Sequence, residues 1–474
     1  GPVHVTVDGG KKWENVTPKT LAPDGRVDCV EPSPHKEGKA YFSTLRYQLG
    51  DLRPYIFKTT DYGKTWSRTN NGIETDDFIK VIREDKKIKD LLYAGAERAF
   101  YISFNGGANW NKLQLNLPVV PVTDLIIKEN DLVASTAGRA FWILDDLGAI
   151  QQSKGDFGNA TAKIFQPKPT WRYSSVSIPE YLGDIPGLGR NPMNGVILDY
   201  YLKEKADTNK VTLVISDMNG KAIRQYTNKK DETFKPYPGG PSAPAAIPSE
   251  AGVNRFAWDF RTESLPGVQG VFVMGDYSGH RVAPGKYKAS ISYKGQTSET
   301  EFEIVQDPKV TATAADWTAQ QEFLNQTANG FQEVHKSVNE MRKVKKQIET
   351  YNDVMKNNTD AKDIVNSGKE LIKKIEKWES NLIEPRSKNF QDVINFPNKL
   401  NAEFLQLRST TDTHDPRLTQ GARDRFQDVQ ADWQKYKSQY NELIQKDVSN
   451  YNRMFKEKGL PALMTETKEV PINN

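Results

Sequence analysis

The sequence predicts a mainly β protein with an α-helical C-terminal region: part of a β-propeller, then a β-sandwich, then antiparallel helices arranged as a bundle or hairpin. Three observations support this prediction in a chain of 474 residues. An octapeptide recurs near the start, short runs of alternating apolar and polar residues fill the middle, and apolar residues repeat with a helical period near the end. These patterns divide the chain into regions 1–150, 151–310 and 311–474.

The recurring octapeptide appears as TVDGGKKW from Thr6, TTDYGKTW from Thr59 and SFNGGANW from Ser103. In each copy a Ser or Thr stands two residues before an Asp or Asn, a Gly follows that residue by two, and a Trp follows it by five. We call these segments the octets. Their matching residues are Thr6, Asp8, Gly10 and Trp13, then Thr59, Asp61, Gly63 and Trp66, then Ser103, Asn105, Gly107 and Trp110.

The residue types of the octets favour a tight turn over catalysis. A short Asp side chain accepts hydrogen bonds from backbone N–H groups a residue or two further on, and Gly supplies the positive φ of a tight hairpin. Asn105 replaces Asp in the third octet, which a turn tolerates because it needs only an acceptor. A Trp at the start of the returning strand is positioned to bury its ring between sheets. We therefore interpret the octets as structural.

The spacing of the octets is typical of propeller blades, so residues 1–150 correspond to about three blades. Asp8, Asp61 and Asn105 lie 53 and 44 residues apart, and a decayed copy one step of 41 residues further on places Asp146 opposite Asn105. A propeller closes with about four to eight blades, and an open ring would expose sheet faces. We expect the chain to be the C-terminal part of a larger protein or half of a split one. Another chain or a missing segment would then complete the ring.

The middle region, residues 151–310, predicts a β-sandwich after a polar linker. Asn219-Gly220 is a hairpin signal between two of its runs. The Pro-rich segment 235–250 indicates a surface insertion rather than a strand. The β-patterned runs are Gly195–Lys203, Lys210–Tyr226, Val253–Arg261, Gly285–Gly295 and Glu299–Gln306.

The last region, residues 311–474, changes to a helical period. Apolar residues recur every three, four or seven positions from about Asp316, again around Ile364–Leu382, and again from about Thr419. Short connections between these stripes favour antiparallel packing. The lysines of this region are interleaved with acidic residues, as on a solvated helix face.

Composition excludes several classes of function. The net charge of +4 arises from 65 basic and 61 acidic residues, a balance that does not indicate nucleic-acid binding. Cys29 is the only cysteine and the 5 histidines are scattered, so we expect no metal site and no cofactor. The sequence contains no run of about 18 apolar residues, so we expect no transmembrane segment.

The octets resemble the Asp-box, or bacterial neuraminidase repeat (BNR), of sialidases, some xyloglucan-cleaving glycosidases and sortilin-type propellers. Longer stretches, such as DLRPYIFKTTDYGKTW and LVASTAGRAFWILDD, resemble the closing blades of bacterial sortilin-like proteins that are often labelled glycosyl hydrolases. NPMNGVILDYYLKEK and APGKYKASISYKG resemble the Ig-like module of that family, and VSNYNRMFKEKGLPAL resembles its helical end. The resemblance implies an extracytoplasmic location: secreted, periplasmic or at the cell surface.

Two departures from the family limit what the resemblance implies. The last blade of the family commonly carries a His in THGR, where this chain has Ala137 in TAGR. The cysteine-rich module of animal sortilins is absent from these residues, so receptor biology does not follow from the resemblance.

Two functions remain open from the sequence. The first is a scaffold that binds a peptide, a protein or a glycan, and the second is a glycoside hydrolase whose catalytic carboxylates lie mostly outside these residues. No catalytic residue is identified, and the weak candidates for a polar site are Glu97, Arg98, Asp145 and Asp146. The sequence favours binding, because nothing outside the turns has the pattern of a catalytic constellation.

Overall fold

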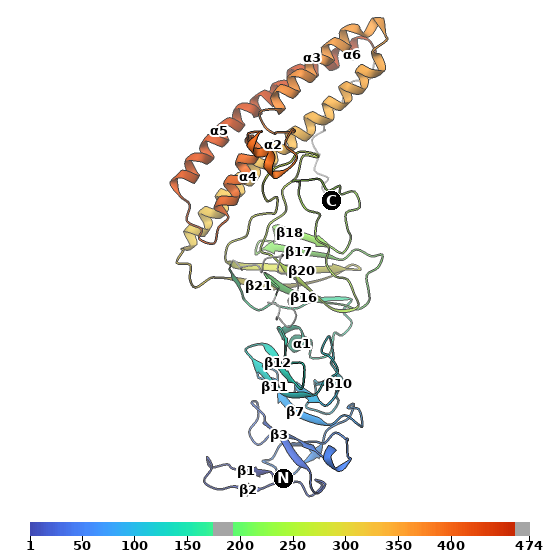
Figure 1. The fold of residues 1–474 in the computed structure, drawn as a ribbon, viewed down its shortest axis with the longest axis vertical. Helices are drawn as coiled ribbons and strands as arrows, with labels where there is room; N and C mark the ends of the chain where they lie inside the picture. Colours follow the sequence, from blue (N-terminus) through green and yellow to red (C-terminus); the bar gives the residue numbers. More distant parts are fainter. Residues whose placement is uncertain (174–192, 460–474) are drawn as a thin grey trace. The chain divides into compact units, whose positions relative to one another are not determined.

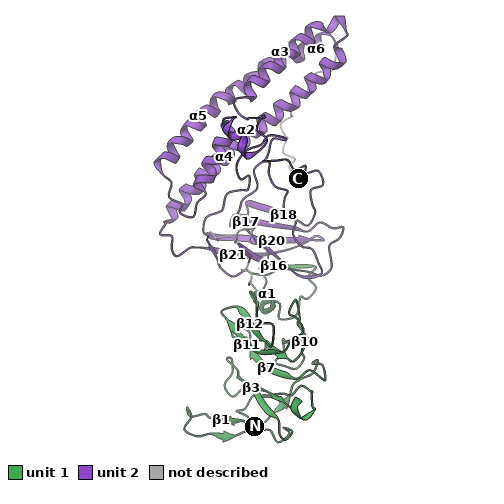
Figure 2. Cartoon of the chain, in the orientation of Figure 1, with its two compact units in different colours: residues 1–166, 190–192, 199–201 green, residues 167–189, 193–198, 202–474 purple. Residues whose placement is uncertain are grey.

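A computed structural model of the chain describes residues 1–173 and 193–459. It contains two compact units (Figure 2): the first comprises residues 1–166 with 199–201, and the second comprises the other described residues. Parts of the predicted polar linker, of NPMNGVILDYYLKEK and of VSNYNRMFKEKGLPAL lie outside the described residues.

The first unit begins with short antiparallel strands (Figure 1). They run in chain order as β1 (His4–Val5), β2 (Glu14–Asn15), β3 (Arg26–Pro32), β4 (Ala40–Leu45), β5 (Ile56–Thr59), β6 (Ser67–Arg68), β7 (Ile79–Glu84), β8 (Leu92–Ala96), β9 (Phe100–Ser103), β10 (Asn111–Lys112), β11 (Val122–Lys128), β12 (Asp131–Thr136) and β13 (Phe141–Leu144). A 3-10 turn, η1 (Tyr47–Leu49), lies between β4 and β5.

The strands of the first unit form four successive sheets of sequential hairpins. β1 pairs with β2, two four-stranded sheets have the orders β3-β4-β5-β6 and β7-β8-β9-β10, and β11-β12-β13 forms a three-stranded sheet. Buried clusters join each sheet to the next. Val3 of the first sheet packs with Phe42 and Phe57 of the second, Ile56 of the second packs with Leu92 of the third, and Tyr93 of the third packs with Leu125 of the fourth.

The chain departs from the repeat after β13. The two four-stranded sheets each end in a short fourth strand, whereas helix α1 (Gly148–Ser153) stands in that place after β13. Strand β14 (Ala162–Ile164) comes next. Asp146 adopts φ of 57° before this helix and accepts a hydrogen bond from the Gly148 amide at 2.9 Å.

Two sheets form the middle of the chain. Their orders are β15-β21-β20-β17-β18 and β14-β16-β19. Trp258 of β19 is fully buried and its ring contacts Tyr287 and Phe302 of the larger sheet, so the sheets pack face to face. The strands are β15 (Thr170–Arg172), β16 (Val196–Leu202), β17 (Thr212–Asp217), β18 (Ala222–Thr227), β19 (Gly252–Trp258), β20 (Gly285–Tyr293) and β21 (Gln296–Gln306).

Helices follow from residue 314. A capping box between Thr313 and Asp316 begins the first of them, α2. The helices are α2 (Ala314–Met355), α3 (Lys362–Glu379), α4 (Leu400–Thr411), α5 (Gln420–Glu442) and α6 (Ser449–Glu457), with 3-10 turns η3 (Thr359–Ala361) and η4 (Phe390–Ile394) and a π-helical turn η5 (Leu443–Val448).

Ion pairs give the relative directions of the long helices. Arg342 pairs with Glu379 and Lys345 pairs with Glu376, so α2 and α3 run antiparallel as expected. Glu333 accepts from Trp433 and Glu340 accepts from Tyr440, so α5 runs parallel to α2. α4 continues the course of α3, because Asn401 contacts His335 and Gln320 donates to the Thr411 carbonyl, and α5 then returns alongside α2.

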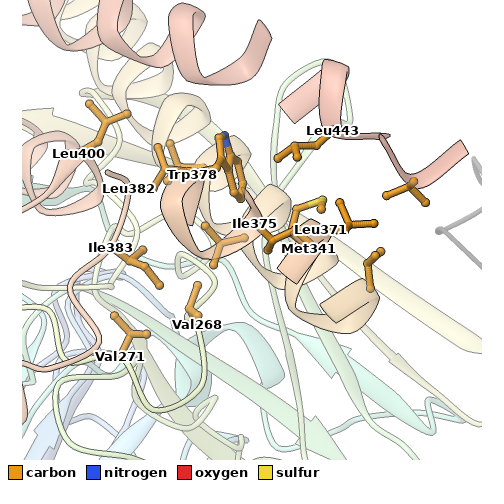
Figure 3. Packing of buried hydrophobic residues seen from close by; sticks show 14 of the residues in the cluster. Val268, Val271, Met341, Leu371, Ile375, Trp378, Leu382, Ile383, Leu400 and Leu443 are labelled. Atoms are coloured by element: carbon orange, nitrogen blue, oxygen red, sulfur yellow. The ribbon is translucent and has the colours of Figure 1, made fainter. Parts of the chain in front are cut away.

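One hydrophobic core joins the helices to a loop that precedes them. Figure 3 shows Met341, Ile375 and Trp378 of the helices near Val268 and Val271 of this loop. All five side chains are buried. Most of the predicted region 151–310 therefore lies in one compact unit with the helices, whereas residues 151–166 and 199–201 belong to the first unit. The coarse prediction of β-sheets followed by a helical C-terminal region is confirmed.

Candidate functional site

The second and third octets form the turns between β5 and β6 and between β9 and β10, and the first lies between β1 and β2. In the second octet the Gly63 amide donates to Thr59 Oγ1 at 2.9 Å, and the Thr65 amide donates to Asp61 Oδ1 at 3.0 Å. The other octets repeat these bonds, with Gly10 and Gly107 donating to Thr6 and Ser103, and Lys12 and Asn109 donating to Asp8 and Asn105. In each copy the Asp or Asn thus acts as an acceptor within the turn.

These hydrogen bonds keep the octet carboxylates ionised. The hydroxyl of Thr65 and other donors lower the pKa of Asp61 to about 2, and the backbone N–H of Lys12 lowers the pKa of Asp8. A general acid at neutral pH needs a pKa raised towards the operating pH. The octet acids are therefore unsuited to donating a proton.

The octet tryptophans link each sheet to the sheet before it. Trp66 Nε1 donates to the Val16 carbonyl at 2.7 Å, and Trp110 Nε1 donates to the Thr69 carbonyl at 2.9 Å. Val16 and Thr69 each stand three residues after the tryptophan of the preceding octet. We call this repeated bond the tryptophan tie.

The octet glycines allow the sheets to approach closely enough for the tie. A Cβ on Gly63 would lie 2.7 Å from Val16, and a Cβ on Gly107 would lie 2.5 Å from Thr69. Both glycines also have positive φ. Any larger residue at these positions would push neighbouring sheets apart.

The opposite end of the sheets carries a mixed set of charged and aromatic side chains. Because β5 and β9 end at an octet, the connections that lead into them lie at the other end. We call this the connection end: it comprises the β4–β5 connection (46–55), the β8–β9 turn (97–99) and the β12–β13 turn (137–140).

Glu97 and Arg98, the predicted polar pair, lie at the connection end but do not pair with each other. Glu97 forms an ion pair with Lys80 at 3.0 Å, and Arg98 forms one with Asp76 at 2.6 Å. The Arg98 amide also donates to the buried carboxylate of Asp77, which fixes the turn.

Asp145 and Asp146 follow β13 at the end of the sheet that corresponds to the octets. Asp146 accepts from the Asn130 side chain at 2.8 Å, and its own amide donates to Asp131. The predicted set Glu97, Arg98, Asp145 and Asp146 is therefore divided between the two ends of the sheets.

Sequence reasoning missed an aromatic group beside Glu97. The Tyr47 ring stacks on Phe78 with centroids 5.0 Å apart, and Lys80 Nζ lies 5.8 Å from the Tyr47 centroid. Tyr47 is partly exposed, and it lies in a segment that also pairs Arg46 and Arg53 with Asp51. The charged and aromatic residues of RYQLGDLRPY lie in a connection longer than the β8–β9 and β12–β13 turns. These two features of the sequence could have indicated the group.

A buried charge cluster in the second unit was also missed. Asp412, which ends α4, lies 3.4 Å from Arg281, 3.5 Å from Arg261 and 3.8 Å from Arg172. Burial lowers the pKa of Arg172 to about 10 despite this carboxylate. These residues come from distant segments, so no sequence pattern joins them. The cluster links the middle sheets to the helices.

Metal-ligand clusters and membrane-spanning helices are both absent from the part of the chain that the structure describes. Within 1–173 and 193–459, no group of three or more His, Cys, Asp or Glu side chains is arranged to hold a metal ion. None of the helices in those ranges is both long enough and apolar enough to cross a membrane.

Comparison with known proteins gives structural likenesses only. No family model matches this chain, and no curated protein matches it. The solved structures that match include YCF48 bound to D1 peptide, which is 19% identical with a TM-score of 0.24 and aligns 30% of this chain with 45% of that one. An ancestral GH74 enzyme is 12% identical with a TM-score of 0.21 and aligns 59% of this chain with 30% of that one.

The Niastella koreensis GH74 enzyme is also 12% identical, with a TM-score of 0.21, over 59% of this chain and 38% of that one. YCF48 and the GH74 enzymes are β-propeller proteins. The chain spans less than half the length of each of these three structures. These TM-scores do not establish a shared fold, so the evidence for the fold is the arrangement of this chain's own sheets.

Proposed function

We propose that this chain forms the closing blades, Ig-like module and helical end of a sortilin-like Asp-box propeller protein, which acts outside the cytoplasm as a scaffold that binds a polypeptide or a glycan. The four successive sheets with their repeated turns and tryptophan ties support the propeller. The extracytoplasmic location rests on the family resemblance. Further Asp-box blades complete the ring.

The connection end carries the binding function. The octet residues are used in turns and in contacts between sheets, whereas the connection end presents a partly exposed Tyr47 beside Lys80 and Glu97, with Arg98 and Asp76 close by in sequence. Partly exposed charges of both signs near an aromatic ring suit a ligand with polar groups and an apolar face. This arrangement is the observation that favours binding.

The carboxylates within the connection end and next to it form ion pairs. Asp51 pairs with two arginines, Asp76 with Arg98 and Glu97 with Lys80. A glycosidase needs one protonated and one ionised carboxyl group on either side of the bond. These pairs favour binding over hydrolysis for the described residues.

The test is a binding screen with matched variants. The chain is exposed to a displayed peptide library and to xyloglucan oligosaccharides, and bound ligands are then measured with Tyr47→Ala and with Tyr62→Ala. Tyr62 has a similar exposed fraction but belongs to an octet, so it serves as the control. We expect Tyr47→Ala to weaken binding at least tenfold and Tyr62→Ala to leave it unchanged. Equal loss in both variants, or release of reducing sugar from xyloglucan, would contradict the proposal.

A further inference from the structure

Both outer faces of the stack of sheets expose residues that the same repeat buries in its interior. The octet tryptophan is 2% exposed at Trp110, where the preceding sheet supplies its tie, and 59% exposed at Trp13 in the first sheet. Trp66 lies between these extremes and is tied to Val16. Trp13 thus stands where Trp66 and Trp110 form their ties, but no sheet precedes its own sheet in the described residues.

The other outer face shows the same contrast. Steps of 44 and 41 residues relate Ile56, Phe100 and Phe141. Their exposed fractions are 0%, 4% and 74%, and Phe141 lies on the last sheet of the stack. Ile102 and Ile143, which are related in the same way, are 4% and 58% exposed.

The exposed residues of the last sheet form a continuous apolar row. Ile126 of β11 pairs with Val133 of β12, and Val133 pairs with Ile143 of β13. Cross-strand partners lie on the same face of a sheet. Phe141, two residues before Ile143, extends this row. An apolar face of this kind marks an interaction surface.

The first sheet is also incomplete within itself. In the second sheet, β4 pairs with β5 through contacts such as Tyr41 with Lys58 and Phe42 with Phe57. The positions that correspond to Phe57 and Lys58 are His4 and Val5, which form β1. β1 pairs with β2 alone, so its other edge has no strand in the described residues.

We infer that the Trp13 face and the Phe141–Ile143 face are docking surfaces for Asp-box blades that lie outside residues 1–474. The contacts between neighbouring sheets inside the stack indicate what the partner must present. The blade before Trp13 presents a backbone carbonyl three residues after its own octet tryptophan, as Val16 and Thr69 do. The incoming strands also pair with the open edge of β1.

A second copy of this chain does not reproduce the tie. In the last sheet, the position that corresponds to the octet tryptophan is Gln151, which lies within α1. The Gln151 side chain donates to Asp85 instead. Val16 and Thr69 directly follow the short strands β2 and β6, whereas the last sheet has α1 at this place, so a second copy would not present a carbonyl to Trp13 in the same setting.

This inference rests on the proposed propeller, and it specifies the complementary surface. The test places the photo-cross-linking residue p-benzoylphenylalanine at position 13 of the chain expressed in its source cells. The cross-linked residue is then identified by mass spectrometry. The same label at position 66 is the positive control, because it lies against Val16. The label at position 171, an exposed tryptophan of β15, is the negative control.

The expected cross-link from position 13 falls on the residue three places after the tryptophan of an octet outside residues 1–474. A Phe141→Ser variant is expected to lower the yield of that product at least fivefold, because closing the ring needs both faces. A cross-link to a second copy of this chain, or to a polypeptide without an octet, would overturn the inference. So would no product from position 13 while position 66 reacts. Failure of the ligand screen alone would leave this result standing.

Discussion

The interfaces between sheets of the first unit and the interface between sheets and helices of the second unit are stabilised by different kinds of interaction. We call these interfaces the seams. The first repeats a neutral bond from an indole N–H to a backbone carbonyl, at Trp66 and Trp110, and adds single ion pairs such as the buried pair of Lys39 with Glu84. The second gathers Arg172, Arg261 and Arg281 around the buried carboxylate of Asp412. A neutral tie brings no charge out of water and can be copied from blade to blade. A charge cluster has to be balanced as a whole.

Removal of Asp412 should destabilise the protein more than loss of a buried histidine or of a tryptophan tie. Asp412→Ala would leave buried guanidinium groups without their shared counter-charge, and loss of one partner of a buried ion pair costs about 3–5 kcal/mol. Thermal or urea unfolding of the second unit measures this cost. Asp415→Ala, which removes an exposed carboxylate paired with Arg417, is the matched control and should cost less than about 1 kcal/mol. Equal losses of unfolding free energy in Asp412→Ala and Asp415→Ala would show that the cluster does not stabilise the interface between sheets and helices.

Acid should weaken the second unit through two buried histidines. Burial lowers the pKa of His280 and of His335 to about 4. His335 Nδ1 donates to the Pro266 carbonyl at 2.9 Å, and Nε2 accepts from the Asn401 amide at 3.1 Å. Both bonds can form together only in the neutral ring.

The sign of the pH effect follows from the depressed pKa. The unfolded chain, with a histidine pKa of about 6.5, binds protons before the folded chain does, so stability falls as the pH drops from about 6.5 to 4. The loss between pH 7 and pH 5 should be about 2 kcal/mol for each histidine. His280 faces Asp412 as well as Arg408, Arg261 and Arg172, and His335 faces Arg342.

Urea unfolding of the chain and of His335→Gln at the two pH values measures this loss. The variant should lose about half of the pH dependence, because His280 remains. A variant that retains the full dependence would assign the acid sensitivity to other groups.

The tryptophan tie makes a smaller and more local prediction. Trp110→Phe removes the indole donor and leaves the Thr69 carbonyl without it, which should cost about 1–3 kcal/mol. Trp13→Phe should change the stability of the chain by less than about 0.5 kcal/mol, because Trp13 is exposed. Urea unfolding of the two variants gives the comparison. A similar cost at both positions would show that Trp13 already has a partner within these residues.

The two seams also differ in how far the sequence could predict them. The residues within each octet keep a fixed spacing, so the turn and the glycine followed from local chemistry. The predicted burial of the tryptophan ring holds at Trp110 but is wrong at Trp13, which is 59% exposed. The carbonyl that accepts the indole N–H lies in another sheet, and its position three residues after a tryptophan became apparent only from the structure.

The charge cluster and the connection end could not be predicted in this way. Asp412 and Arg172 are 240 positions apart in the chain, and no period relates them. Glu97 and Arg98 were found as neighbours, but adjacent residues of a turn point to different partners, which for this pair are Lys80 and Asp76. The parallel course of α2 and α5 follows because α4 continues in the direction of α3, which the apolar stripes did not indicate.

The octet acid should tolerate an amide, which is the smallest change predicted. Asn105 already holds its turn with the backbone bond that Asp61 also accepts, so Asp61→Asn should leave stability at pH 7 nearly unchanged, whereas Asp61→Ala should lower it. The pKa of Asp61 is lowered to about 2, below that of an unfolded aspartate. Its stabilising contribution is therefore present above about pH 4 and lost as the pH falls towards 2. Asp61→Asn should lack that loss, and Asn105→Asp should acquire it.

Urea midpoints of the first unit at pH 7 and pH 3 measure both effects. If Asp61→Asn were as damaging as Asp61→Ala at pH 7, the charge of Asp61 and not its acceptor oxygen would hold the turn. The octet would then need a carboxylate, and Asn105 would mark a weakened blade. If the two variants separate as expected, the octet is a neutral device like the tryptophan tie. The repeated turns and ties of the first unit would then work without charge, in contrast to the single ion pair of Lys39 with Glu84 and to the cluster around Asp412.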